Sequence, residues 1–122
     1  MQITEDFGSG RHLINAYGQG YIRINQREYR QNILLTPDQI IEGWCDCQPQ
    51  LLSTDYFSPL LDQDIELILL GTGSTLIFPP ASLMQHFLCK QVGFEVMDSG
   101  AACRTYNVLL AEERHVAAAI WV

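Results

Sequence analysis

Two polar turns in this chain follow apolar runs that have the character of buried strands. Gly71-Thr72-Gly73-Ser74 closes the run at residues 65–70, and Asp98-Ser99 closes the run at residues 94–97. Glycine-rich turns let backbone amides approach an anion or a carboxylate. If the two runs are parallel neighbours, both turns lie at one edge of the sheet, where open α/β sheets bind ligands.

This edge is therefore the leading candidate for a ligand-binding pocket. Its residues come from the glycine turn, the acidic turn and the first turns of the helix that follows: Thr72, Gly73, Asp98, Ser99, Arg104 and Thr105. The structural alternative is commoner: the glycines only end a strand, and Asp98 only caps a helix. The glycine turn has neither the lysine of a P-loop nor the third glycine of a dinucleotide-binding motif.

A second polar group lies toward the other end of the same helix. At a rise of about 1.5 Å per residue, Asp98 and Arg114 are roughly 24 Å apart and cannot share an active site. We expect structural roles, in which Asn107 bonds a neighbouring loop, and Glu112 and Arg114 fix the turn into the last strand. The residues assigned to structure are Gly71, Asn107, Glu112 and Arg114.

Metal binding and nucleophilic catalysis are both disfavoured. Cys45-x-Cys47 and His86-x-x-Cys89 supply four ligands of the types that zinc accepts, but their spacing is not that of a zinc ribbon or finger. Cys103 lies in the middle of the predicted helix, and the chain has no G-x-S-x-G motif. We expect no metal, no cofactor and no catalytic residue.

Length and composition favour one folded domain over residues 1–122, with residues 1–12 as a flexible N-terminal segment. The 122 residues are 48% hydrophobic, enough to bury a core. A net charge of -7 disfavours nucleic acid and anionic membrane surfaces as partners. No apolar run approaches the roughly 20 residues of a membrane-spanning helix, and the N-terminus does not resemble a signal peptide. We expect a cytoplasmic protein with reduced cysteines.

The elements that must position the pocket follow from turn signals and apolar patterning. Short strands at residues 13–17, 21–25, 28–29 and 33–35 form an antiparallel meander, with turns at Gly18, Gly20 and Asn25-Gln26. A further strand is expected over residues 39–44 and a short helix over residues 53–61. The nearly continuous apolar run 65–70 predicts the centre of the sheet.

The C-terminal part alternates helices and strands. One helix starts at Pro79-Pro80 and is ended by Gly93, and a strand follows at residues 94–97. The next helix begins at Asp98 or Ser99 and runs to about Glu112, and residues 116–122 form the last strand. The second helix should pack on the sheet through a narrow apolar face: Ala101, Ala102, Thr105, Val108 and Leu109. The strand-helix-strand order predicts a right-handed parallel crossover.

Four sequence stretches carry a resemblance to a known family: LILLGTG, FPP, MDSGAACRTYN and LLAEERHVAAAI. Over residues 14–122 the chain resembles a small-domain family of unknown function that includes mitochondrial complex I assembly factor 3 and the adipogenesis-associated domain-containing protein. The resemblance implies a three-layer α/β domain with a mixed central sheet, packed helices and an antiparallel β meander alongside. Ser99 stands where the family often has threonine, and Glu113 where glycine is frequent, which puts a tight turn at Glu113 in question.

The resemblance implies an accessory or assembly role without enzymatic activity, carried by contacts with a protein partner. Exposed aromatic side chains would make that contact, and the candidates are Tyr17, Tyr21, Trp44, Tyr56 and Phe57. The alternative is a small-molecule-binding protein or enzyme that uses the Gly71–Gly73 loop and Asp98.

Overall fold

The computed structural model describes residues 11–122, so most of the segment expected to be flexible, residues 1–12, lies outside the described residues. Five strands form a mixed sheet in the order β6-β5-β9-β7-β8. These strands are β5 (Ile33–Thr36), β6 (Gln39–Glu42), β7 (Leu67–Gly71), β8 (Gly93–Met97) and β9 (Val116–Ile120). A separate antiparallel sheet contains β2 (Ile14–Gly18), β3 (Tyr21–Ile24) and β4 (Arg27–Tyr29).

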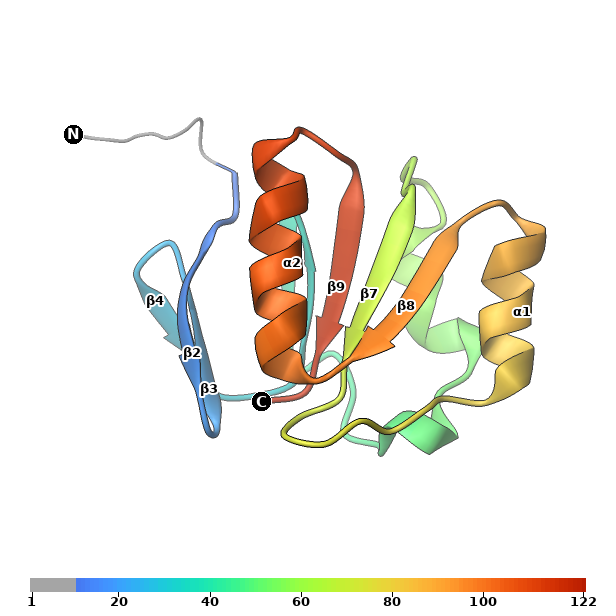
Figure 1. The fold of residues 1–122 in the computed structure, drawn as a ribbon, viewed down its shortest axis with the longest axis horizontal. Helices are drawn as coiled ribbons and strands as arrows, with labels where there is room; N and C mark the ends of the chain where they lie inside the picture. The colour runs from blue at the N-terminus through green and yellow to red at the C-terminus, as the bar shows by residue number, and fades with distance from the viewer. Residues whose placement is uncertain (1–10) are drawn as a thin grey trace.

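Two α-helices and two short 3-10 helices cover the large sheet (Figure 1). They are α1 (Ala81–Cys89), α2 (Ser99–Ala111), η1 (Pro49–Leu51) and η2 (Thr54–Leu60). The short helix expected over residues 53–61 is therefore present, but as 3-10 turns, and Ser53 makes no side-chain cap. The predicted three-layer α/β arrangement with a mixed sheet and a separate meander is confirmed.

The large sheet separates two hydrophobic clusters because its strands alternate their side chains between the two faces. On one face, Leu69, Ala118 and Ile120 pack with the small sheet and with α2, which presents Ala102 and Tyr106. On the other face, the strand residues pack with η2, α1 and a group of aromatic side chains: Leu34, Ile68, Leu70, Ala117 and Ala119. The central sheet is thus buried on both sides.

The middle strand of the sheet is β9, and this corrects the prediction that the run 65–70 is central. Strand β9 pairs in parallel with β7 and antiparallel with β5. All five of its residues are buried, and three of them are alanines. Short side chains suit this position because helix α2 crosses β9 closely. Because alanine side chains are small, the sequence of β9 is less hydrophobic than that of the leucine-rich β7. The sequence therefore indicated β7, and not β9, as the central strand.

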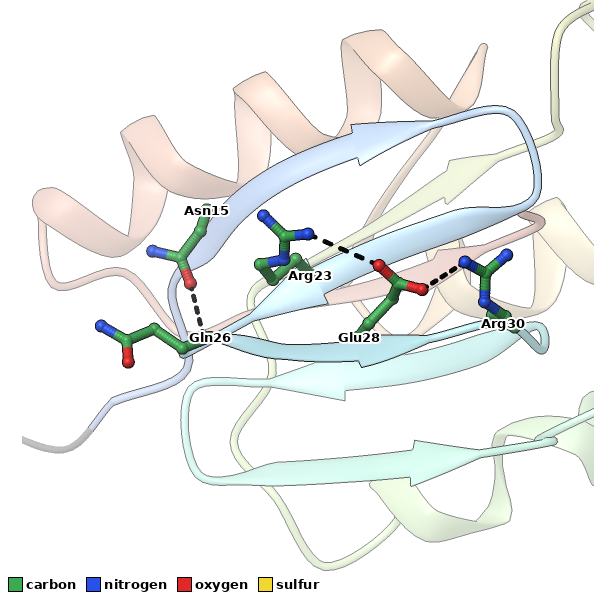
Figure 2. Close-up of polar contacts among 5 residues, drawn as sticks. All are labelled: Asn15, Arg23, Gln26, Glu28 and Arg30. Carbon is green, nitrogen blue, oxygen red and sulfur yellow. Dashed lines mark hydrogen bonds and ion pairs between the residues drawn. The ribbon is translucent and has the colours of Figure 1, made fainter.

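The predicted meander is shorter than expected. Its fourth segment, β5, leaves the small sheet and pairs with β6 and β9 in the large one. The turn at Asn25-Gln26 is confirmed, since both residues have positive φ angles, 49° and 75°. Figure 2 shows that the Asn15 side chain accepts a hydrogen bond from the Gln26 backbone and that Glu28 pairs with two arginines, Arg23 and Arg30. This surface of the small sheet is charged.

Both helices end in the same hydrogen-bonded motif. Gln91 ends α1 with φ 62°, and Val92 N–H bonds to Phe87 O at 2.9 Å. Glu113 ends α2 with φ 59°, and Arg114 N–H bonds to Leu109 O at 3.0 Å. These are Schellman-type C-caps, in which the left-handed residue is usually glycine. The prediction that Gly93 ends α1 was wrong, because Gly93 is the first residue of β8. The turn at Glu113 is kept although the residue is not glycine.

We expect Glu113→Gly to raise the free energy of unfolding by about 1 kcal/mol, because glycine adopts a positive φ without the strain that a Cβ atom causes. Chemical denaturation of the full chain measures this change. The matched control is Glu112→Gly, one residue earlier at φ -87°, where glycine should instead destabilise. Equal effects at both positions would contradict the strain argument.

Candidate functional site

The two predicted turns lie side by side. Strands β7 and β8 are parallel neighbours, and Gly71 is paired with Met97 in the register. Beyond them, Ser99 N–H donates to Gly73 O at 2.8 Å, and Gly73 N–H donates to Ser99 Oγ at 2.8 Å. The predicted meeting of a glycine turn and a helix cap is therefore present. The Gly73 amide that could have held an anion is used within the protein itself.

Thr72 and Gly71 have structural roles at this edge of the sheet. Thr72 is 4% exposed, and its hydroxyl donates to Thr75 O at 2.6 Å and accepts from Ile77 N–H at 3.0 Å. It braces the loop after β7. A Cβ atom at Gly71 would come within 2.8 Å of Ala102 Cβ, so a glycine is needed where α2 crosses β7.

Asp98 is the N-cap of α2, as predicted, and its carboxylate accepts the Ala101 N–H at 2.8 Å. Arg104 lies further along the helix and donates to the Tyr17 hydroxyl, joining α2 to the small sheet. Thr105 is half-buried and does not contribute to the cleft described next.

A cleft of about 490 Å³ lies between the β2–β3 hairpin, the N-terminus of α2 and the end of β9. Gly73, Asp98 and Ser99 line it, but Thr72, Arg104 and Thr105 do not. The opposite wall is the hairpin, which our sequence reasoning did not include: Tyr17, Gly18, Gln19, Gly20, Tyr21 and Ile22. Two tyrosines flanking a glycine turn were the signal that could have pointed to this wall.

The cleft is weakly charged. Among the described residues that line it, Asp98 is the only one with a charged side chain. Cys103 forms part of its floor and is 1% exposed, and burial raises the pKa of its thiol to about 12. A protonated thiol is a poor nucleophile. The arrangement can hold a small neutral or cationic group, and its buried thiol is not an activated nucleophile.

The Asn107 side chain bonds backbone groups, but its partner is Ile14, the first residue of strand β2, rather than the neighbouring loop that we expected. Its Oδ1 accepts the Ile14 N–H at 3.0 Å, and its Nδ2 donates to Ile14 O at 2.7 Å. At the preceding position, the hydroxyl of the fully buried Tyr106 donates to His12 O at 2.9 Å. Burial raises the pKa of Tyr106, which keeps this donor protonated. Helix α2 thereby holds the small sheet in place.

The turn between α2 and β9 is held by Glu66 together with Arg114. Arg114 Nε donates to Glu66 Oε1 at 2.9 Å, and His115 N–H donates to Glu66 Oε2 at 3.3 Å. These bonds lower the pKa of the Glu66 carboxyl. The carboxylate that bonds this turn is that of Glu66, directly before β7, whereas Glu112 was expected to fix it. Sequence spacing gave no sign of a partner 48 residues away.

A larger hollow of about 890 Å³ lies at the opposite edge of the large sheet, between η2, the C-terminus of α1 and the start of β7. Titratable side chains on its rim include both acids and bases: Asp55, Asp64, Glu66, His86, Lys90, Glu113 and His115. Within residues 11–122, however, no three His, Cys, Asp or Glu side chains gather as metal ligands would. The Cys45, Cys47, His86 and Cys89 side chains do not come together in a zinc site.

The aromatic side chains proposed for partner contact are partly in the core. Phe57 is 2% exposed, and its ring contacts the half-buried Trp44 at a centroid distance of 5.4 Å. Of the five candidates, Tyr17 is the most accessible, at 39%. Larger apolar exposures occur elsewhere, and two of them lie on the loop after β7, Leu76 at 54% and Phe78 at 59%.

Comparison with known proteins gives one family and several relatives. The family model described as "Protein of unknown function (DUF498/DUF598)" matches residues 14–121. The chain is 36% identical to NADH dehydrogenase (ubiquinone) 1 alpha subcomplex assembly factor 3 of Danio rerio, over 98% of this chain and 70% of that protein. It is 29% identical to a 13 kDa major membrane protein of Francisella tularensis, over 98% of both chains.

Solved structures agree with this relationship. A crystal structure of a protein from Bordetella parapertussis superimposes with a TM-score of 0.84 at 30% identity, covering 93% of this chain and 98% of that one. Across residues 11–122, neither helix has the length and apolar character that crossing a membrane requires.

Proposed function

Since the chain belongs to the DUF498/DUF598 family of proteins of unknown function, we propose that it is a non-enzymatic accessory or assembly protein that acts through protein–protein contacts. The family includes proteins named as complex I assembly factors. The contact surface that we assign is the loop between β7 and α1, centred on Leu76 and Phe78. Its partner would be a protein, and neither nucleic acid nor membrane insertion is part of the proposal.

One observation carries this assignment: the loop is uncharged and exposes two large apolar side chains. Residues 67–85 contain no Asp, Glu, Lys or Arg, although the chain has 21 such residues in 122. Leu76 and Phe78 project from this stretch with more than half of their surfaces exposed. Protein interfaces are depleted of charge at their centres and enriched in aromatic side chains. The composition of this loop fits such a centre.

The loop is also preorganised. The Thr72 hydroxyl binds both Thr75 O and Ile77 N–H, and Pro79-Pro80 restricts the backbone before α1. Figure 1 shows the loop running along the lower edge of the molecule from β7 to α1. An ordered loop loses little conformational freedom on binding, which favours affinity. The backbone that carries Leu76 and Phe78 is therefore held in place.

A capture experiment tests this surface. The immobilised full chain is incubated with lysate of its source cells, and bound proteins are quantified by mass spectrometry. We expect a bound protein whose recovery falls at least about 10-fold with Leu76→Ser/Phe78→Ser, as loss of two central contacts predicts. The matched control is Leu88→Ser/Val108→Ser, which removes apolar groups that are 71% and 58% exposed on other surfaces.

The control variant should capture the partner as well as the unaltered chain does. Recovery that is unchanged by the Leu76 and Phe78 substitutions, or equally reduced in the control, would overturn the assignment of this loop. Circular dichroism of each variant verifies that it is folded.

We place the protein in the cytoplasm, and its recovery in the membrane fraction of its own cells would contradict that placement.

The cleft at Asp98 favours a second function, binding of a small molecule. Its volume of about 490 Å³ is within the range of ligand pockets. Because Asp98 is its charged group, small cationic or neutral ligands are favoured over nucleotides. A thermal-shift screen with amines, carboxylates, nucleotides and metals tests this. Asp98→Asn keeps a capping side chain and removes the charge, so it should abolish a shift caused by a cationic ligand without unfolding α2.

A further inference from the structure

The basic residues of this acidic chain are concentrated in and beside the small sheet. Residues 11–30 contain four arginines and one glutamate, whereas residues 31–122 contain three basic and eleven acidic residues. Strands β2, β3 and β4 all lie within the first of these two ranges. The small sheet therefore carries a local positive charge, while the rest of the described chain is strongly negative.

Two of these arginines flank one carboxylate on the exposed face of the small sheet. Arg23 in β3 is directly opposite Glu28 in β4, and Arg30 follows Glu28 by two residues, the spacing that returns a side chain to the same face. Arg23 Nη2 lies 3.5 Å from Glu28 Oε1, and Arg30 Nη2 pairs with Glu28 Oε2. Figure 2 shows Glu28 between the two guanidinium groups. We call Arg23, Glu28 and Arg30 the arginine face.

Both guanidinium groups remain accessible to a partner. The side chains of Arg23 and Arg30 are 45% and 68% exposed. Each guanidinium carries five N–H donors, whereas one carboxylate has about four acceptor sites, so Glu28 cannot satisfy both arginines. Donors are left for an incoming carboxylate, and the pairing with Glu28 limits the freedom that the two side chains would lose on binding.

The ion pairs with Glu28 contribute little to the stability of the small sheet, as is usual for exposed pairs. The sheet is held instead by the buried side chains of its other face, which include Ile22, Ile24 and Tyr29. Hydrogen bonds from Asn107 of α2 to Ile14 hold it as well. Stability of the fold therefore does not explain why two exposed arginines lie together here.

We propose that the arginine face binds an acidic segment of a partner protein, whose Asp or Glu carboxylates contact Arg23 and Arg30. The charges are complementary, and a guanidinium can bind a carboxylate through two parallel hydrogen bonds. Arginine is also the basic side chain that is enriched in protein interfaces, while lysine is depleted. The arginine face shares no residue with the loop of Leu76 and Phe78, so it is a second contact surface beyond the one proposed above.

The other two arginines of residues 11–30 are placed differently. The Arg27 guanidinium lies over the ring of Tyr29, 5.0 Å from its centroid, and 3.8 Å from a carboxylate oxygen of Glu42. Arg11 is half-buried at the start of the described chain. Both add positive charge near the arginine face, whose direct contacts we assign to Arg23 and Arg30.

A short acidic segment suits this face better than an extended polyanion does. Electrostatic interactions are screened over about 8 Å at physiological ionic strength, so a short segment is affected mainly by the charges that it touches. A nucleic acid duplex or an anionic membrane surface covers more of the molecule and would meet the acidic residues outside the small sheet. We therefore assign the face to a protein segment.

Fluorescein-labelled hexaglutamate is the probe, and its anisotropy is measured against the full chain. We expect saturable binding in about 20 mM salt that weakens at least about 10-fold in about 200 mM salt, because screening acts on exposed charges. Labelled hexaglutamine should not bind. Arg23→Gln/Arg30→Gln should weaken hexaglutamate binding at least about 10-fold in about 20 mM salt, because both charge-assisted contacts are lost.

The matched control is Lys90→Glu, which lowers the net charge by the same amount as the two arginine substitutions. Lys90 is exposed at the end of α1, outside the small sheet. This variant should bind hexaglutamate within about twofold of the unaltered chain, because the contact is local. Glu28→Gln removes the carboxylate that competes for the arginines and should strengthen binding at least about 3-fold. Circular dichroism verifies that each variant is folded.

Several results would overturn this assignment. They are no binding of hexaglutamate by the unaltered chain, weaker binding by Glu28→Gln, or an equal loss in Lys90→Glu and in the arginine variant. Tighter binding of hexathymidylate or of phosphatidylserine vesicles would assign the face to a nucleic acid or a membrane instead. Leu76→Ser/Phe78→Ser should leave hexaglutamate binding unchanged, so failure of this surface is distinguishable from failure of the loop.

Discussion

Replacing Phe57 by alanine is expected to lower the free energy of unfolding by about 3–5 kcal/mol, the usual loss when a large aromatic side chain is removed from a core. Phe57 is 2% exposed, and its ring lies 5.3 Å from that of Phe87 and 6.0 Å from that of Phe94. It also contacts Trp44, so one side chain joins η2 to α1, to β8 and to the segment before Cys45. Guanidinium denaturation measures the loss.

The matched control is Leu61→Ala, four residues along the same segment, where the side chain is 72% exposed. Its effect should stay within about 0.5 kcal/mol, as is usual for exposed positions. A Phe57→Ala loss no larger than that of the control would mean that the aromatic cluster contributes little to the fold. Phe57→Leu keeps part of the apolar volume and should fall between the two.

The second large effect is expected at Asn107, where leucine should destabilise the protein by about 2–4 kcal/mol. Asn107 satisfies both backbone groups of Ile14, a residue that is 4% exposed. Leucine has a similar size but bonds neither group, and each buried backbone group left without a partner costs about 1–3 kcal/mol. Denaturation gives the total, and amide hydrogen exchange shows where the structure loosens.

The loosening should be confined to the small sheet, because Asn107 joins β2 to α2. Faster exchange is expected in β2 and β3, and the cleft beside Asp98 should open, since this hairpin forms one of its walls. Asn107→Asp keeps an acceptor for Ile14 N–H but loses the donor to Ile14 O, so its loss should be smaller. Unchanged exchange in β2 with Asn107→Leu would contradict this role.

These two residues bear on the proposed function in different ways. Phe57 supports the face of the large sheet opposite α2, while Asn107 supports the cleft. The loop with Leu76 and Phe78 depends on neither contact, because the Thr72 hydroxyl braces it. Partner capture should therefore survive Asn107→Leu at temperatures where the variant remains folded, while binding of a small ligand in the cleft should weaken.

Much of the fold was predictable from local patterns. Backbone preference and capping act over a few positions, so they can be read from neighbouring residues in the sequence. They predicted the Asn25-Gln26 turn, the Asp98 cap and the apolar runs that form β7 and β8. The parallel pairing of β7 and β8 followed from the helix between them. It brought the Gly73 turn and the Asp98 cap together as predicted.

The face that α2 buries was predicted less well. The expected stripe included Val108, which is 58% exposed, and left out Tyr106, which is fully buried. Val108 and Tyr106 are both compatible with a helix. Which face of α2 is buried therefore depends on the elements that pack against the helix. Here β2 contacts α2 in addition to the large sheet, and the buried surface of the helix extends to Asn107 and Tyr106.

By itself, the sequence determined the Asp98 cap, the Asn25-Gln26 turn, the alternation of helices and strands in the C-terminal part, and the edge of the sheet at which Gly73 and Asp98 lie. Tertiary structure alone decided that Ser99 occupies the Gly73 amide, that Tyr17 and Tyr21 line the cleft, and that Glu66 rather than Glu112 holds the last turn. The physical reason is the separation along the chain of the residues that interact. Caps and turns act within a few residues, whereas each of these contacts joins segments at least 26 residues apart, whose meeting depends on the packing of the whole chain.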